Sequence, residues 1–183
     1  HAVFGVETLT FYHHTGCDIV SPDGAIDSCY LLEHDGVRIV LDLGNGSLGE
    51  LQNYLDPLDE SALAAVVLSH CHVDHCADLA SLFVMRHYAP TRPTRALPII
   101  GPSDTTARIA AIYGMDDPGM LANEFAVQSF EPHEMHVGPF ALQVARAVHP
   151  VEAYSVRVTA GGRSITYSGD TGPNAALATL AEG

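Results

Sequence analysis

A short apolar segment that runs directly into a cluster of metal-binding side chains is the feature that most restricts how this chain can fold. Residues 64–68 read AAVVL, a β-branched run that fits a buried strand. The candidate ligands that follow within six residues are His70, His72, Asp74 and His75. Because alternate side chains point the same way, His70 and His72 can face one point and the other two a second point. A tetrahedral zinc needs three protein ligands plus water, so four ligands this close suit two metals better than one.

The alternative interpretation of residues 70–75 is a polar loop whose histidines are incidental. That interpretation leaves unexplained why an apolar strand should end directly in four donor groups. Cys71 and Cys76 are also potential metal ligands. Since Cys71 stands between two candidate ligands, we interpret both thiols as small buried apolar side chains.

Two residues later in the chain can complete such a site. His149 follows a predicted strand over 140–147 and precedes Pro150, which keeps the local backbone extended. Asp170 lies in the segment Ser-Gly-Asp-Thr-Gly, where the glycines allow a sharp turn. Each residue alone has an ordinary structural explanation. Their placement after strands, as for residues 70–75, favours the metal site.

Composition restricts the class of protein. The 183 residues are 47% hydrophobic and 16% charged, which predicts one compact domain over 1–183 and excludes a disordered chain. The formal net charge of −14 disfavours nucleic acid and anionic membranes as partners. No apolar run approaches the roughly 20 residues that span a bilayer. Four cysteines without a regular framework are typical of a cytoplasmic protein with reduced thiols, and eleven histidines point to metal chemistry.

Strands and helices are interspersed along the chain, which predicts mixed α/β layers. We expect strands at 7–12, 28–34, 37–42, 64–68, 97–100, 125–130, 140–147, 154–159 and 164–167, and a loop at 13–27. Asp35-Gly36 between two apolar runs is typical of a hairpin turn. Ser47 and Ser103 are the expected N-caps of two helices, another helix is expected over 77–88, and Pro173 is expected to open the last.

The pattern HxHxDH after an apolar strand, then a histidine, then an aspartate in a Gly-Asp-Thr turn, resembles the metallo-β-lactamase superfamily over nearly the whole chain. The resemblance implies a four-layer αββα sandwich with a dinuclear metal site at one edge of its two sheets. It assigns the first metal to His70, His72 and His149, and the second to Asp74, His75 and a bridging Asp170. The two divalent ions are expected to be zinc, with manganese or iron as alternatives.

Finer features resemble the ribonuclease-Z-like group, which includes tRNA 3′-processing nucleases and cyclic-nucleotide phosphodiesterases. The segments that carry this resemblance are 41–46, 69–79 and 167–171. Two others, 83–88 and 100–104, are most similar to actinobacterial phosphodiesterases that act on cyclic AMP. Two departures stand out. Val73 replaces the glycine typical of the nucleases, and residues 171–183 lack the histidine that completes the group's second metal site. We therefore expect a domain truncated at its C-terminus, without its last strands and that histidine.

The resemblance predicts a metal-dependent hydrolase that cleaves phosphodiester bonds, with a small cyclic nucleotide such as cyclic AMP as substrate. Metal-activated hydroxide is the expected nucleophile, and Asp74 is the expected catalytic residue that orients or deprotonates it. The alternatives are a ribonuclease-Z-like tRNA 3′-end endonuclease and a non-catalytic metal-binding scaffold. A β-lactam or thioester hydrolase fits the flanking motifs less well. The expected partners are the small phosphodiester and, in a homodimer, a second copy of the chain.

Asp42 ends a predicted strand near the same edge, and two interpretations of it stay open. It can hydrogen-bond a ligand imidazole from outside the metal's own ligands, or it can cap the glycine-rich turn that follows. Four further histidines show no partner pattern and are expected at the surface or in loops: His13, His14, His133 and His136. Arg86 and His87 are expected on a solvated helix face.

Overall fold

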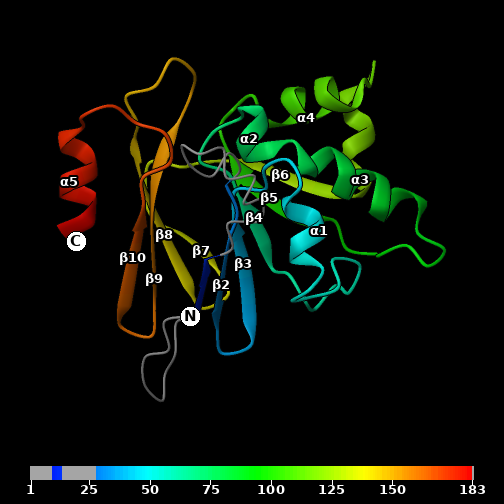
Figure 1. Cartoon of the computed structure of the whole chain (residues 1–183), viewed down its shortest axis with the longest axis horizontal. Coiled ribbons are helices and arrows are strands. Elements are labelled where there is room, and N and C mark those ends of the chain that lie inside the picture. Colours follow the sequence, from blue (N-terminus) through cyan, green and yellow to red (C-terminus); the bar gives the residue numbers. More distant parts are fainter. Residues whose placement is uncertain (1–9, 14–27, 183) are drawn as a thin grey trace, which may run out of the picture.

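Two β-sheets lie face to face in the computed structural model, which describes residues 10–13 and 28–182 (Figure 1). Within these residues the first sheet has six strands in the order β1-β2-β3-β4-β5-β6 and the second has four in the order β10-β9-β8-β7. The first sheet contains β1 (Thr10–His13), β2 (Tyr30–His34), β3 (Val37–Leu41), β4 (Ala65–Val67), β5 (Leu97–Gly101) and β6 (Phe125–Ser129). The second contains β7 (Met135–Val137), β8 (Phe140–Arg146), β9 (Tyr154–Ala160) and β10 (Arg163–Tyr167).

Helices cover the outer faces of both sheets, so the four predicted layers are confirmed (Figure 1). The first sheet carries α1 (Ser47–Leu51), α2 (Val73–Cys76), α3 (Asp78–Tyr88), α4 (Thr105–Tyr113) and the 3-10 helix η1 (Pro118–Asn123). The second sheet carries α5 (Ala175–Glu182), which contacts β8, β9 and β10. No helix in the described part of the chain combines the length and the apolarity that crossing a membrane requires.

Alternation along the central strands divides the apolar side chains between two cores. Ile39 and Leu41 of β3 join the core between the sheets, while Val40 joins the core between the first sheet and its helices. β4 alternates in the same way and is buried at every residue. Phe140 of β8 contributes to the core between the sheets and Phe83 of α3 to the other. Because both faces of β4 are packed, the position of this strand is fixed, and so is the position of the residues that directly follow it.

The polar ends of four strands meet at one edge of the first sheet. β3, β4, β5 and β6 pair in parallel, so their C-terminal ends lie side by side. An antiparallel bridge between His70 and Ala153 then joins the segment after β4 to the segment before β9 in the second sheet. This edge therefore collects loops from both sheets.

The hairpin turn predicted at Asp35-Gly36 is confirmed, because the required backbone conformations are present. Asp35 and Gly36 have φ of 50° and 74°, as a two-residue hairpin turn between antiparallel strands demands. Gly114 ends α4 with φ of 84°. The predicted strand over 7–12 begins at Thr10 within the described residues, and most of the predicted loop over 13–27 lies outside them.

The predicted N-caps are wrong. Gly46, with φ of 87°, occupies the cap position of α1, and Ser47 is the first residue of the helix. Asp104 precedes α4, while the Ser103 hydroxyl donates a hydrogen bond of 2.5 Å to the Glu152 carboxylate of the other sheet's loop. Both the amide and the hydroxyl of Ser103 are thus directed at Glu152, and no side chain among the described residues caps α4.

Three further features differ from the sequence predictions. β7 and η1 were not predicted, since both are short and lack a clear periodicity. The last helix begins at Ala175 instead of Pro173, and the side chain of Asn174 accepts a hydrogen bond from the Ala176 amide at 2.9 Å.

The expectation of a solvated face around Arg86 is also wrong. Arg86 is only 3% exposed, and its guanidinium donates to the carbonyls of Pro57 at 3.2 Å and Arg95 at 2.6 Å. His87 Nδ1 lies 2.9 Å from Glu124 Oε1. These side chains join α3 to neighbouring loops instead of facing solvent.

Candidate metal centre

The segment after β4 is fixed between the two sheets. The Ser69 carbonyl accepts a hydrogen bond of 2.9 Å from the Tyr154 amide, and the Ala147 amide donates to the Ala153 carbonyl at 2.9 Å. His70, which follows Ser69, is fully buried. These backbone contacts place the start of the histidine motif against the loop that contains His149, 77 residues further along the chain than His72.

Four side chains form a first cluster at this edge, and they are His70, His72, His149 and Asp170. His72 Nδ1 lies 3.1 Å from His70 Nε2 and 3.1 Å from His149 Nε2. Asp170 Oδ2 lies 4.0 Å from His70 Nε2. All four potential ligand atoms lie within 4.8 Å of one another, so they surround one point.

A second cluster shares Asp170 with the first and adds Asp74 and His75. His75 Nε2 lies 3.4 Å from Asp74 Oδ2 and 3.5 Å from Asp170 Oδ1. The two oxygens of Asp170 therefore face different clusters. One carboxylate between two groups of ligands is the arrangement that a bridging ligand requires.

The donor set fits divalent cations. Zinc–nitrogen bonds of about 2.0–2.1 Å in a tetrahedral site separate two ligand nitrogens by about 3.3 Å, which is close to the 3.1 Å between His72 Nδ1 and each neighbouring imidazole. Imidazole and carboxylate ligands suit zinc, manganese and iron. The residues present can hold such an ion.

Asp42 lies behind the second cluster as a buried hydrogen-bond acceptor. Its Oδ1 accepts from the Ser69 amide at 2.6 Å, and its Oδ2 lies 2.7 Å from His75 Nδ1. The same Oδ2 accepts from the hydroxyls of Ser69 at 2.7 Å and Tyr167 at 2.6 Å. Of the two interpretations of Asp42, the structure places its side chain on the imidazole of His75, a proposed ligand. Its own φ of 57° turns the chain out of β3.

These hydrogen bonds decide which imidazole nitrogen is free to bind a cation. The Ser69 hydroxyl donates its hydrogen bond to Asp42, so its oxygen accepts a hydrogen bond from His70 Nδ1, 3.1 Å away. Asp42 likewise accepts from His75 Nδ1. Nε2 of both imidazoles is therefore the atom directed at the clusters, as expected when the other nitrogen has a fixed partner.

Burial and charge act differently on these two imidazoles. Burial, and then the neighbouring His75, lower the pKa of His70 to about 4, so this ring is neutral at physiological pH. Burial also acts to lower the pKa of His75, but the hydrogen bond and charge of Asp42, together with the charges of Asp74 and Asp170, raise this pKa above its ordinary value. The surroundings of the two rings thus shift their pKa values in opposite directions.

Glycine-rich segments allow the supporting loops to approach one another. A Cβ added to Gly44 would overlap the Asp74 carbonyl, which also accepts a hydrogen bond of 3.0 Å from the Ser28 amide. Gly169 has φ of 57° and lies against Ser69. Glycine at these two positions is a steric requirement of the site.

The structure brings together all six side chains proposed as ligands, and their role as ligands stays a proposal. Cys71 and Cys76 are buried, as predicted. His133 and His136 are exposed at the surface, also as predicted. His14 and the side chain of His13 lie outside the described residues.

Two functional candidates were missed from the sequence, and they are Ser69 and Tyr167. Both reach Asp42, and Tyr167 does so from a position 125 residues further along the chain. Each stands immediately beside a predicted ligand motif, and that adjacency is the signal that could have identified them.

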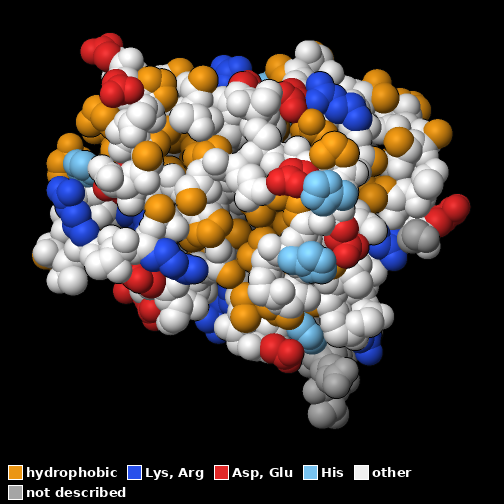
Figure 2. Space-filling model, turned by 180° about the vertical axis from the view of Figure 1, so that it is seen from behind, with side chains coloured by type: hydrophobic (Ala, Val, Ile, Leu, Met, Phe, Trp, Pro, Cys, Tyr) orange, Lys and Arg blue, Asp and Glu red, His pale blue; other side chains and the backbone are white. Residues whose placement is uncertain are grey.

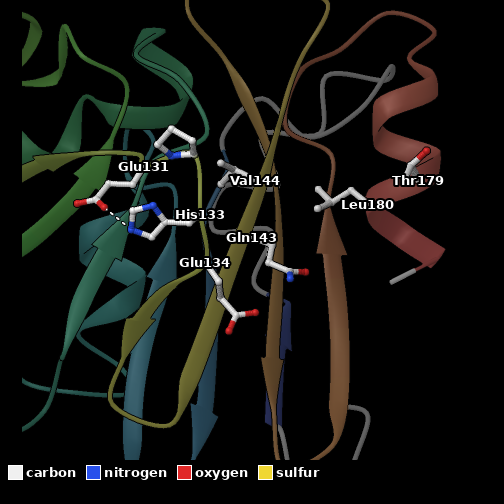
Figure 3. Close-up of a pocket in the computed structure, with 8 residues that line it drawn as sticks. Glu131, His133, Glu134, Gln143, Val144, Thr179 and Leu180 are labelled. Atoms are coloured by element: carbon white, nitrogen blue, oxygen red, sulfur yellow. Dashed lines mark ion pairs between the residues drawn. The ribbon is translucent and has the colours of Figure 1, made fainter.

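A separate pocket lies away from these clusters, between residues 131–134, β8 and α5 (Figure 3). Its volume is about 310 Å³, and its lining includes Glu131, His133, Gln143 and Leu180. His133 Nε2 pairs with Glu131 Oε2 at 2.7 Å. None of the proposed metal ligands lines this pocket.

An αββα sandwich with histidine and aspartate clusters at one sheet edge defines the class of metallo-β-lactamase fold proteins. A family model described as the β-lactamase superfamily domain matches residues 37–182. The chain belongs to the metallo-β-lactamase superfamily.

Known proteins place the chain within this superfamily. An uncharacterized protein of Mycobacterium leprae is 38% identical over 177 residues, covering 92% of this chain and 60% of that protein. A ribonuclease Z of Mycobacterium sp. (strain KMS) is 29% identical over 167 residues, covering 84% of this chain and 58% of that protein. The crystal structure of the metallo-β-lactamase fold protein YhfI from Bacillus subtilis gives a TM-score of 0.66 at 27% identity, covering 83% of this chain and 58% of that one. The chain thus spans about three fifths of the length of these relatives.

Proposed function

We propose that this chain forms the metal-binding part of a hydrolase that holds two divalent cations, zinc first among them, and cleaves phosphodiester bonds. The observation that carries the proposal is the sharing of Asp170 between two clusters of ligand atoms. His70, His72 and His149 would hold one ion with Asp170, and Asp74 and His75 the other. Manganese and iron are the alternative ions.

Two divalent ions, when bound, supply an activated water and neutralise the negative charge that develops on a phosphoryl group. The chain's own residues would do the rest. The side chains of Asp74 and Asp170 are 44% and 49% exposed, whereas His75 is buried. Since Asp170 is shared by the two clusters, Asp74 is the exposed carboxylate that belongs to one cluster alone. We assign to Asp74 the orientation of this water and the acceptance of its proton. Asp42 and Ser69 hold the imidazoles in position.

A small cyclic nucleotide such as cyclic AMP is the substrate we propose. The net charge of −14 opposes a long polyanion, although a local site can still attract one phosphodiester. On the face shown in Figure 2, the arginines are scattered instead of forming one basic surface. Six of the eight arginines already pair with or donate to groups of this chain: Arg38, Arg86, Arg95, Arg108, Arg146 and Arg157. Most guanidinium groups of the chain therefore already have partners within it, which disfavours an extended contact with an RNA backbone.

The second candidate is a tRNA 3′-end endonuclease, which the 29% identity to a ribonuclease Z favours. The decisive experiment is turnover of cyclic AMP and of pre-tRNA, side by side, by the full-length protein loaded with zinc. We expect hydrolysis of cyclic AMP that disappears after chelation and returns with metal. Cleavage of pre-tRNA alone would replace the proposal with the nuclease. Bound metal without turnover of either substrate would favour the non-catalytic scaffold.

A further inference from the structure

We propose that Tyr167 is a positioning residue for the second metal position, acting through Asp42 on His75. The inference rests on the proposed two-metal function and deepens it. It concerns a hydroxyl that touches neither cluster directly but fixes the carboxylate on which an imidazole ligand depends.

The geometry around Asp42 Oδ2 supports this role. Three donors converge on this single oxygen: the Tyr167 hydroxyl at 2.6 Å, the Ser69 hydroxyl at 2.7 Å and His75 Nδ1 at 2.7 Å. Asp42 is fully buried, so water does not replace a donor that is removed. Loss of one donor changes the balance of forces that orients the carboxylate toward the other two.

Tyr167 remains a donor in this network. Burial, followed by the negative charge of Asp42, raises the pKa of Tyr167 far above its ordinary value, so the hydroxyl keeps its proton. The ring is held as well, because its centroid lies 5.0 Å from that of Tyr30 at a tilt of 54°. A fixed ring and a protonated hydroxyl give the bond to Asp42 a defined direction.

The end of β10 thereby holds His75 from both sides. Tyr167 is the last residue of β10 and acts on the Nδ1 side of the imidazole through Asp42. Asp170, three residues later, lies 3.5 Å from Nε2 on the other side. One short segment of the second sheet therefore sets the orientation of a ligand that belongs to the first sheet's loop.

Ser69 provides the contrast that makes the inference specific. Its hydroxyl also donates to Asp42, but its oxygen lies 3.1 Å from His70 Nδ1 in the first cluster. The bond from Tyr167 leads to His75, whereas Ser69 extends the network to His70. Removing the Ser69 hydroxyl should therefore affect His70 as well as His75, whereas removing the Tyr167 hydroxyl should act on His75 first.

The test compares Tyr167→Phe with Tyr113→Phe, which removes the same atom from a tyrosine on α4 at 38% exposure. The zinc-loaded proteins are dialysed against increasing EDTA, and the zinc per chain is counted. Two-bond ¹H–¹⁵N spectra of the imidazoles are recorded with and without metal. For Tyr167→Phe we expect one ion to leave at about 10-fold lower EDTA, as for other changes behind a metal ligand. The His75 signals should shift while those of His72 and His149 stay unchanged, and Tyr113→Phe should match the parent protein.

Ser69→Ala gives an independent arm, in which the His70 signals should shift. The proposal is overturned if Tyr167→Phe keeps both ions at the parent's EDTA resistance, or if all imidazoles shift equally. It is also overturned if Ser69→Ala disturbs His75 alone. In metal-free protein the His75 Nδ1 signal still has to respond to Tyr167→Phe, so the inference can fail separately from the proposed function, which is judged by turnover of cyclic AMP.

Discussion

Gly169 lies so close to Ser69 that a Cβ built on the glycine would stand 2.9 Å from the Ser69 Cβ. The same Cβ would meet the Tyr154 carbonyl oxygen at 3.2 Å. This contact joins the loop after β10 to the loop after β4, and the next residue, Asp170, takes its place between the two clusters. The absence of a side chain at position 169 is therefore what allows the shared carboxylate to reach both.

Gly169→Ala should separate the loops and weaken metal binding. The matched control is Gly162→Ala, because Gly162 has φ of 70° but nothing within 4 Å of its added Cβ. Positive φ alone should cost each variant about 1–2 kcal/mol of unfolding free energy. Only Gly169→Ala should also lose zinc, measured per chain after gel filtration. Equal zinc content in both variants would show that the close contact is not needed.

His72→Ala should remove the proposed ligand at the centre of the first cluster. His72 Nδ1 lies 3.1 Å from both neighbouring imidazoles, so its loss leaves them without a common partner atom. Since changes behind a ligand already cost about 10–100-fold, we expect phosphodiester hydrolysis to fall by at least about 100-fold, with no more than one ion retained per chain. His136→Ala, at an exposed histidine of β7, should behave like the parent. Retained activity in His72→Ala would refute the assignment of the site.

The parts of the site that the sequence predicts are those with local patterns. His70 and His72 follow a buried strand at alternate positions, so their convergence follows from strand geometry alone. The contact between Tyr167 and Asp42 joins residues that are 125 apart, and no local period encodes it. Ser103 shows the converse error, because its sequence fits a helix cap while its hydroxyl bonds Glu152 across the sheets. Tertiary partners decide what such polar side chains do.

Glu152 should make the protein more sensitive to acid. The hydrogen bond from Ser103 lowers the pKa of this carboxyl, against the opposing effect of its partial burial and with help from the Tyr154 hydroxyl. A depressed pKa in the folded state contributes stability above the ordinary value of 4.5, and this contribution is lost as the pH falls through the folded pKa. Glu152→Gln should therefore lower Tm at pH 6 and show a flatter decline toward pH 3.

The measurement is Tm by circular dichroism across this pH range. Glu134→Gln, which removes another carboxylate beside β7, controls for the loss of one negative charge. The predicted difference between Glu152→Gln and the parent should close as the pH falls. A difference that stays constant from pH 6 to pH 3 would contradict the role of the Ser103 bond.

Arg86→Met should be strongly destabilising, although Arg86 belongs to neither cluster. The substitution keeps most of the apolar stem but removes the donors to the Pro57 and Arg95 carbonyls. The Pro57 acceptor is buried and the Arg95 acceptor is partly buried. Since a buried acceptor that loses a charged donor costs about 1–3 kcal/mol, the unfolding free energy in urea should fall by about 2–4 kcal/mol. Arg108→Met removes a half-exposed arginine of α4 that pairs with Asp104 at the start of the helix, and such pairs contribute about 0.3–0.5 kcal/mol. If both variants unfold at the same urea concentration, the hydrogen bonds from Arg86 to the loops before β4 and β5 do not stabilise the fold.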